Sequence, residues 1–287
     1  MRRLHILLAA LVYISNSISA PAAQQRVIST FLCTDEYVFR LVPRDRIAAL
    51  SWEAVDRRPV VSTIADAARG ILVIRPATET VLALKPDLVV MYAGTNPRLH
   101  LNLKKLGVPV LDVPWANSLA DIRTTTRMLG DKLGAPGRAN ALLAEMDRKI
   151  AAVKTKAPHP PVHAILFEPQ GYANVQGVTD EVMRIAGVEN AAPAGAMTRA
   201  GQLPVEAVIA AAPELIILGG EEHIGSARAY AILHHPALRA LAGRTHMEFV
   251  GLTPLLCPGP WSIDSAETLG DLARRARALA PGKGRNY

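Results

Sequence analysis

Short apolar runs alternate along the chain with longer segments in which apolar residues recur every three or four positions. Seven such runs lie near Val27–Thr30, Ile47–Leu50, Leu88–Met91, Val108–Val113, His163–Phe167, Leu215–Leu218 and Met247–Leu252. Runs of this length are typical of strands buried on both faces, and their alternation with helices predicts parallel sheets. In sheets of this kind, ligands bind beyond the carboxyl ends of the strands.

Part of this pattern occurs twice. The segment Glu79–Val90 is repeated in register as Glu206–Ile217, and each copy predicts a short helix that ends near Pro, then an acid and a buried strand. A second, shorter similarity is the Thr-Asp-Glu sequence, which occurs at Thr34–Glu36 and again at Thr179–Glu181. Each Thr is predicted to begin a helix because its hydroxyl can accept hydrogen bonds from free N–H groups of the first turn. The repeats predict two similar α/β lobes.

A long helix is predicted between the two copies. The segment 136–156 is rich in helix formers, and its apolar residues recur at helical spacing. We therefore expect an α/β protein of two Rossmann-like lobes with parallel sheets, joined by one long interdomain helix. The predicted parts are an N-terminal lobe over 24–135, the linking helix over 136–157 and a C-terminal lobe over 158–287.

The segment 1–23 has the three regions of a secretory signal peptide. Arg2 and Arg3 are followed by the apolar run Leu4–Ile14 and by the small residues Ala20–Ala23. The alternative, a retained membrane anchor, needs a longer apolar run. We expect a cleavable signal peptide over 1–23 and a soluble mature protein in the periplasm.

Composition narrows the class of protein. Hydrophobic residues make up 50% of the 287 positions and charged residues 20%, which is typical of a globular protein. The net charge of +7 is spread along the chain and does not indicate nucleic-acid binding. The two cysteines, Cys33 and Cys257, permit a disulfide in an oxidising compartment, but two free thiols or a role at a ligand site stay open.

Large aromatic residues follow the predicted strands, where a ligand would be met. They are Trp52, Tyr92, Trp115, Tyr172 and Trp261, with Arg98, Arg199 and His223 as nearby polar candidates. Flat apolar side chains in such loops suit a bulky planar or chelated ligand. The alternative is that each aromatic residue covers the core of its own lobe.

Glu79 and Glu206 occupy matched positions in the repeat. Each opens a predicted helix, so its carboxylate can simply stabilise the helix N-terminus. Alternatively, two lobes related by pseudo-symmetry present one exposed acid each to basic pockets on a symmetric partner.

Catalytic motifs are absent from the sequence. It lacks a Gly-x-Gly-x-x-Gly motif after a strand, a phosphate-binding loop, His-Glu-x-x-His and Gly-x-Ser-x-Gly. The adjacent His234 and His235 would point apart on a helix and make a poor metal site. We therefore expect neither an enzyme nor a metal site of the protein's own.

Several segments resemble the periplasmic substrate-binding proteins of ABC importers for cobalamin, ferric siderophores and heme. They are Arg26–Ser29, Ile47–Leu50, Val81–Val90 and Leu106–Val110. The resemblance implies a class III receptor in which two α/β lobes, joined by one long helix, hold a metal chelate between them with little hinge closure. It implies no cofactor of the protein's own and a monomer that delivers its ligand to an ABC permease dimer with ATPase subunits.

The resemblance also implies roles for individual residues. Glu79 and Glu206 match the docking glutamates that pair with permease arginines. The implied ligand contacts are Trp52, Tyr92, Trp115, Tyr172, Arg199 and Trp261. The basic residues favour a ferric siderophore over cobalamin. A heme-binding member of the family, a metal-cluster enzyme and a chelate sensor on the same scaffold are the alternatives, although no Tyr or His is placed so as to indicate heme ligation.

Overall fold

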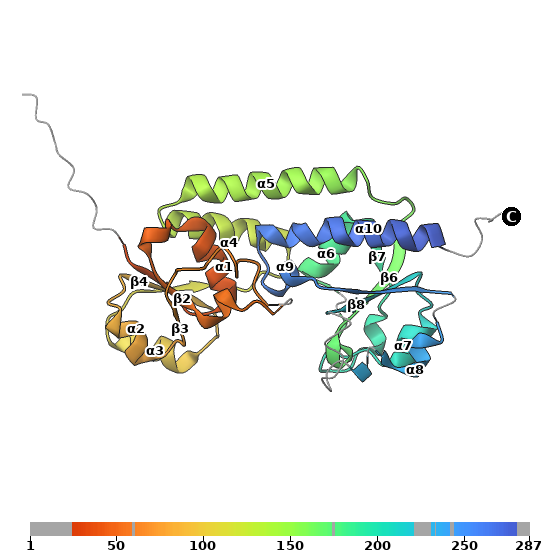
Figure 1. The fold of residues 1–287 in the computed structure, drawn as a ribbon, viewed down its shortest axis with the longest axis horizontal. Helices are drawn as coiled ribbons and strands as arrows, with labels where there is room; N and C mark the ends of the chain where they lie inside the picture. Colours follow the sequence, from red (N-terminus) through yellow and green to blue (C-terminus); the bar gives the residue numbers. More distant parts are fainter. Residues whose placement is uncertain are drawn as a thin grey trace, which may run out of the picture.

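The computed structural model describes residues 25–58, 61–173, 176–220, 231–232, 234–241 and 244–279. The predicted signal peptide and His223 lie outside these residues. Within them the chain forms two parallel sheets, and a long helix spans the distance between them (Figure 1). The predicted fold class, two α/β lobes with parallel sheets joined by one helix, is confirmed.

The N-terminal sheet has five strands in the order β3-β2-β1-β4-β5, all parallel. Its strands are β1 (Val27–Ser29), β2 (Ile47–Ser51), β3 (Val73–Ile74), β4 (Leu88–Tyr92) and β5 (Val110–Val113). The helices of this lobe are α1 (Leu32–Leu41), α2 (Thr78–Ala83), α3 (Pro97–Lys105) and α4 (Leu119–Lys132), with the 3-10 turns η1 (Arg44–Arg46) and η2 (Trp52–Val55).

The C-terminal sheet has four parallel strands in the order β7-β6-β8-β9. Its strands are β6 (Val162–Phe167), β7 (Val188–Asn190), β8 (Leu215–Gly219) and β9 (His246–Val250). Its helices are α6 (Val178–Ile185), α7 (Val205–Ala210), α8 (Pro236–Arg239), α9 (Thr253–Leu256) and α10 (Asp264–Leu279), with the 3-10 turns η3 (Pro169–Gly171), η4 (Ala194–Ala196) and η7 (Pro260–Ile263).

The linking helix is α5 (Pro136–Lys154), close to the predicted bounds. It runs beside α4 and α10 along one side of both sheets, while α2, α3, α7 and α8 lie on the other side (Figure 1). The residues that α5 buries, Ala139, Leu143 and Met146, recur at helical spacing. Within the described residues, no helix is long and apolar enough to cross a membrane.

The repeat in the sequence corresponds to a repeat in the structure. The elements α2 and β4 correspond to α7 and β8 in the register that the sequence repeat sets. In both copies the residue before the Pro has a left-handed backbone, with φ of 47° at Lys85 and 42° at Ala212. A left-handed residue ends each helix and turns the chain toward the following strand.

The two helix starts predicted at Thr34 and Thr179 are displaced. Helix α1 begins at Leu32 with Phe31 as its N-cap, and α6 begins at Val178. The prediction that Thr34 opens the helix is therefore wrong by two positions. Its hydroxyl donates back to the Phe31 carbonyl over 2.8 Å from inside the first turn.

Each lobe contributes a segment to the core of the other. Cys257 and Trp261, from the end of the chain, lie in the hydrophobic core of the N-terminal lobe. Ala116 and Ile122, from the connection between β5 and α4 and the start of α4, lie in the core of the C-terminal lobe. The lobes are therefore joined by this reciprocal exchange as well as by α5.

Candidate functional site

The carboxyl ends of β4 and β5 carry an aromatic stack, which we define as Phe31, Tyr92 and Trp115. The rings of Phe31 and Tyr92 are stacked with centroids 5.7 Å apart, and the Tyr92 and Trp115 rings meet edge to face at 4.2 Å. The Trp115 indole donates to the Ala93 carbonyl over 2.8 Å, yet 53% of the residue is exposed. The stack therefore holds one large flat surface open to a ligand.

Tyr92 is buried and packs against the ring of Trp115. The residue is only 1% exposed, and burial raises its pKa. Its hydroxyl lies near the backbone of Ala116 but makes no hydrogen bond of good geometry within the described part of the chain. Of the predicted contacts at this end of the sheet, Trp115 is exposed and Tyr92 is buried against it.

A second aromatic residue, Trp52, lies at the carboxyl end of β2 under a guanidinium. The Arg75 Cζ atom is 4.4 Å from the centroid of a Trp52 ring. The two residues directly follow Ser51 and Ile74, which are partners in the register of β2 and β3. Arg75 is exposed and makes no ion pair with any described residue. Its stacked guanidinium keeps its N–H edge free for an anion.

Sequence reasoning missed Arg75. It follows β3, a strand of two residues that is too short to give a pattern of alternation. In the sequence, Arg75 lies a few positions before the repeat segment that begins at Glu79, and nothing there marks it as a site residue.

A buried carboxyl group holds the backbone that precedes Trp52. The Ser51 amide donates to Asp35 Oδ1 over 3.0 Å, and the Ser51 hydroxyl donates to Oδ2. Burial raises the pKa of Asp35 to about 8, against the opposing effect of hydrogen bonds from Ser29 and Ser51. Asp35 thus fixes the end of β2 from the first turn of α1.

The predicted contacts of the C-terminal lobe lie in the connection after β6 and in the loop before α7. Tyr172 is 39% exposed and forms a β-bridge with Gln202, whose side chain donates to the Gln170 carbonyl over 3.0 Å. Arg199 is exposed in the same loop as Gln202. Among the described residues, neither Tyr172 nor Arg199 makes a hydrogen bond or ring contact with the aromatic stack.

Trp261 lies in the joint between the lobes and is only 5% exposed. Its ring meets the Tyr37 ring at 4.8 Å, the Arg40 guanidinium stacks on it at 4.3 Å, and its indole N–H donates to the Cys257 carbonyl over 2.9 Å. These contacts leave little of the predicted ligand contact open to a ligand.

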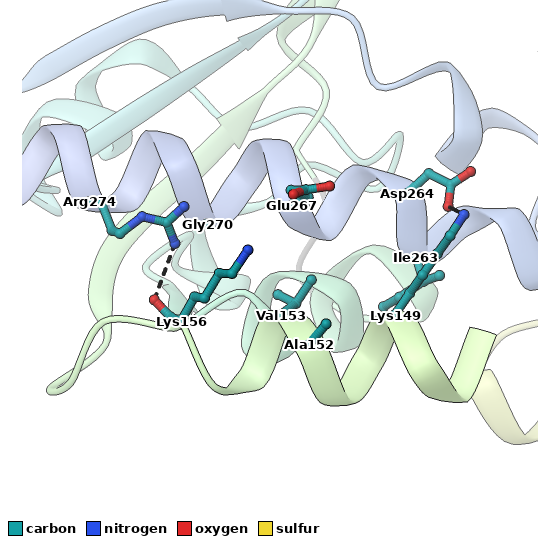
Figure 2. Close-up of a pocket in the computed structure, with 9 residues that line it drawn as sticks. All are labelled: Lys149, Ala152, Val153, Lys156, Ile263, Asp264, Glu267, Gly270 and Arg274. Carbon is teal, nitrogen blue, oxygen red and sulfur yellow. Dashed lines mark hydrogen bonds and ion pairs between the residues drawn. The ribbon is translucent and has the colours of Figure 1, made fainter. Parts of the chain in front are cut away.

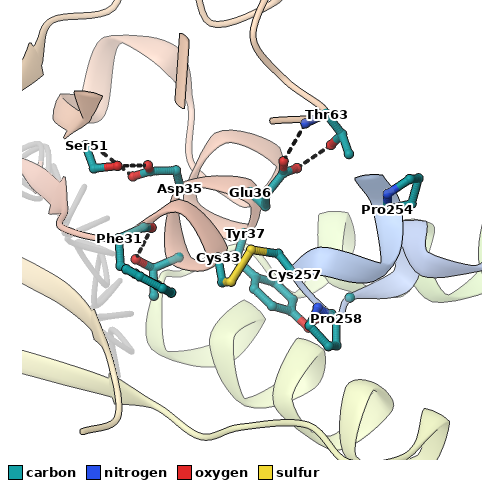
Figure 3. Close-up of a disulfide and its surroundings, with 12 residues drawn as sticks. Phe31, Cys33, Asp35, Glu36, Tyr37, Ser51, Thr63, Pro254, Cys257 and Pro258 are labelled. Atoms are coloured by element: carbon teal, nitrogen blue, oxygen red, sulfur yellow. Dashed lines mark hydrogen bonds between the residues drawn. A yellow bond between two sulfur atoms is a disulfide. The ribbon is translucent and has the colours of Figure 1, made fainter. Parts of the chain in front are cut away.

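The two cysteines are bonded to each other. Cys33 in α1 and Cys257 after α9 form a disulfide whose Cα atoms are 4.8 Å apart across 224 residues of sequence (Figure 3). Of the three alternatives left open by the sequence, the structure has the disulfide. Neighbouring Tyr37 donates from its hydroxyl to the Pro258 carbonyl over 3.4 Å.

Glu79 and Glu206 are the second residues of α2 and α7, and both are exposed. Neither helix has a side-chain hydrogen bond at its N-cap, and neither glutamate forms an ion pair with a described residue. Both carboxylates are therefore unpaired within the described chain.

A pocket of about 190 Å³ lies on the helical side of the molecule, between α5 and α10 (Figure 2). Its rim carries charges of both signs: Lys149 is paired with Asp264, and Arg274 donates to the Lys156 carbonyl over 3.1 Å. None of the predicted ligand contacts lines it. Among the described residues, no group of three or more His, Cys, Asp or Glu side chains is placed to hold a metal ion.

Comparison with solved structures finds the same fold in many chains, and three periplasmic proteins among them serve as examples. The heme-binding protein BhuT, in complex with two hemes, is 23% identical with a TM-score of 0.68, and the match covers 89% of this chain and 99% of that one. The heme-binding protein HutB of Vibrio cholerae is 19% identical with a TM-score of 0.68, covering 90% and 100%. The vitamin B12 binding protein BtuF of Vibrio cholerae is 18% identical with a TM-score of 0.62, covering 88% and 98%.

At these identities the likeness concerns the fold alone. No curated protein matches the sequence of this chain. The model of the periplasmic binding protein family matches residues 40–246, which run from the end of α1 to the first residue of β9 and include the whole of α5. The chain therefore belongs to the periplasmic binding protein family.

Proposed function

We propose that this protein is the periplasmic substrate-binding component of an ABC importer. It captures a metal chelate between its lobes and delivers it to a permease dimer with ATPase subunits, and it performs no chemical step. The favoured ligand is an anionic ferric siderophore, followed by a cobalamin-type chelate. Membership of a family of transport binding proteins supports this role.

The observation that carries the ligand class is the stacking of Arg75 on Trp52, 4.4 Å from its ring centroid. A guanidinium held on an indole loses little freedom when it binds, and its planar donors match a carboxylate. Trp115 adds an exposed flat surface at the same edge of the sheet. An anionic chelate with an apolar periphery matches both features, whereas cobalamin has a periphery of amide groups and a single phosphodiester anion and therefore matches them less well.

The matched glutamates support delivery to a permease. Glu79 and Glu206 stand at equivalent positions of two similar lobes, exposed and unpaired within the described chain. A dimeric partner related by two-fold symmetry presents two equal basic pockets, and one glutamate per lobe matches that arrangement.

Titration of the purified mature protein tests the proposed ligand class. The ligands are ferric siderophores of the carboxylate, catecholate and hydroxamate classes, cobalamin and hemin, and the readout is tryptophan fluorescence. We expect saturable quenching by at least one anionic ferric chelate. Saturation by cobalamin alone would exclude the siderophore assignment, and no response from folded protein to any ligand would contradict chelate binding.

A heme-binding member of the same family is the second candidate. Two of the structures with this fold, BhuT and HutB, are named as heme-binding proteins, and the flat Trp115 surface also suits a porphyrin. Hemin titration followed by its absorption spectrum distinguishes the candidates. A shifted, saturable heme band at one equivalent, with no response to ferric siderophores, would establish the heme assignment in place of ours.

A further inference from the structure

The two lobes contact each other at two equivalent places, which we call joints. In one joint the first turn of α1 contacts the segment after β9, through the bond between Cys33 and Cys257. In the other the first turn of α6 contacts the segment after β5, where the Glu181 carboxylate accepts from the Leu119 amide over 2.9 Å. The two joints therefore differ in strength, because one contains a covalent bond and the other a hydrogen bond.

The covalent joint is close in sequence to the aromatic stack. Phe31 is two positions before Cys33 and is the N-cap of α1, and its ring stacks on Tyr92. Tyr92 in turn holds the edge of Trp115 at 4.2 Å. A connection therefore runs along the backbone from Cys33 to Phe31, and then through ring contacts to Tyr92 and the exposed indole.

Side chains from both ends of the chain pack around the disulfide and hold α1 in place. Both cysteines are 4% exposed, and Tyr37 lies beside them on the next turn of α1 (Figure 3). Trp261 packs against the Tyr37 ring. Glu36 accepts from Arg40 and from the Thr63 amide, so α1 is also tied to the loop after η2. The start of α1 has little freedom to shift while the bond to Cys257 exists.

We propose that the Cys33–Cys257 disulfide is a positioning pair for the ligand site. It holds Phe31 and Tyr92 so that Trp115 presents one fixed face, and loss of the bond releases Trp115 without unfolding the lobes. The position of Trp115 does not depend on the proposed function. The consequence for affinity does, because a less ordered Trp115 must be ordered again when a ligand binds.

The test uses the full mature chain labelled with 5-fluorotryptophan, whose three fluorine resonances are assigned by Trp52→Phe, Trp115→Phe and Trp261→Phe. In a Cys33→Ala, Cys257→Ala variant we expect the Trp115 resonance to shift, broaden or split while that of Trp52 stays in place. Trp52 is the internal control because its ring lies against Arg75, which follows β3 and is not part of α1. An unchanged Trp115 resonance in the folded variant overturns the proposal.

A second variant tests the ring contacts that the proposal requires, even if the cysteine variant fails to fold. Phe31→Leu keeps the disulfide and removes the ring that lies between it and Tyr92, so we expect the Trp115 resonance to change here too. Phe249→Leu, the same replacement on β9 in the core of the C-terminal lobe, is the matched control and should change that resonance less. A Trp115 signal unaffected by Phe31→Leu overturns the set of contacts that the proposal requires.

The effect on ligand affinity is measured separately, with whichever ferric siderophore or hemin saturates the wild type. We expect the dissociation constant to rise by roughly tenfold in the cysteine variant, the scale of about 1.4 kcal/mol. A changed Trp115 resonance with unchanged affinity would overturn the role in binding. Failure of every ligand with the wild type contradicts the proposed function instead, and the fluorine spectra separate the two failures.

Discussion

Asp87 and Glu214, at equivalent positions of the repeat, make the same hydrogen bond in the two lobes. The Arg26 amide donates to Asp87 Oδ2 over 2.7 Å, and the His163 amide donates to Glu214 Oε1 over 3.0 Å. In both lobes the acid thereby accepts a hydrogen bond from a backbone amide at the start of an inner strand of the sheet, β1 or β6. The repeat contains a second matched pair of acids, Glu79 and Glu206, which are exposed and make no such bond among the described residues. We call Asp87 and Glu214 the structural pair, and Glu79 and Glu206 the free pair.

The structural pair should affect stability where the free pair does not. Asp87→Ala leaves the Arg26 amide without its partner, and we expect the free energy of unfolding to fall by about 1 kcal/mol. Glu79→Ala, in the same copy of the repeat, should stay within about 0.5 kcal/mol of the wild type. Urea denaturation measures both, and equal losses from the two substitutions would contradict the division of roles.

The free pair should affect delivery alone. In the Glu79→Ala, Glu206→Ala variant, we expect ligand affinity to stay unchanged and uptake by vesicles that contain the permease and its ATPase to be lost, because both basic pockets lose their partner. Glu267→Ala, also an exposed glutamate on a helix, is the matched control. Full uptake by the double variant would remove the docking assignment.

Arg75 should contribute electrostatic affinity for an anionic chelate. Arg75→Gln removes the charge over Trp52, and we expect the dissociation constant to rise by about tenfold, the loss of one hydrogen bond to a charged group. The salt dependence of binding should weaken at the same time. Arg239→Gln, an exposed arginine on α8 without an ion pair among the described residues, is the control. An affinity that changes equally in both variants would show a general charge effect and no specific site at Arg75.

Asp35 should make stability depend on pH. Its pKa is raised from the ordinary value of 3.8 to about 8, so between these values the folded chain keeps a proton that the unfolded chain has lost. This contribution to stability is complete below the ordinary pKa and is lost as pH rises through about 8, with a slope of about 1.4 kcal/mol per pH unit at most.

Replacing Asp35 should remove that dependence. We expect the difference in unfolding free energy between Asp35→Asn and the wild type to change in favour of the variant as pH rises from about 4 to about 8. Asp131→Asn, at an exposed position of α4, controls for the general effect of removing a carboxylate. Parallel pH profiles for Asp35→Asn and the wild type would show that Asp35 titrates below this range.

The sequence predicted those parts of the fold that depend on local pattern. Buried strands such as β4 and β8 and the amphipathic α5 have their own periodicity, and the repeat alone relates one lobe to the other. The edge strands β3 and β7 were missed because two or three residues contain no periodicity. The displaced start of α1 has a similar cause, because Phe31 caps the helix without a side-chain hydrogen bond.

The candidate site was less predictable because long-range packing decides which side chains are exposed. Trp115 and Trp261 both follow the last strand of their lobe, yet Trp115 is exposed and Trp261 is buried against Tyr37. The segment that carries Trp261 enters the core of the other lobe, and nothing in its local sequence indicates this destination. Arg75 was missed because its significance comes from stacking on a residue of a neighbouring strand.

The reciprocal exchange of segments has a consequence for the biogenesis of the protein. The core of the N-terminal lobe contains Cys257 and Trp261, so the first half of the chain has no complete core until almost the whole polypeptide is available. Contacts across such a distance in sequence make folding slow and dependent on the entire chain. Neither lobe expressed alone is expected to be a stable module, because each depends on a segment of the other to complete its core.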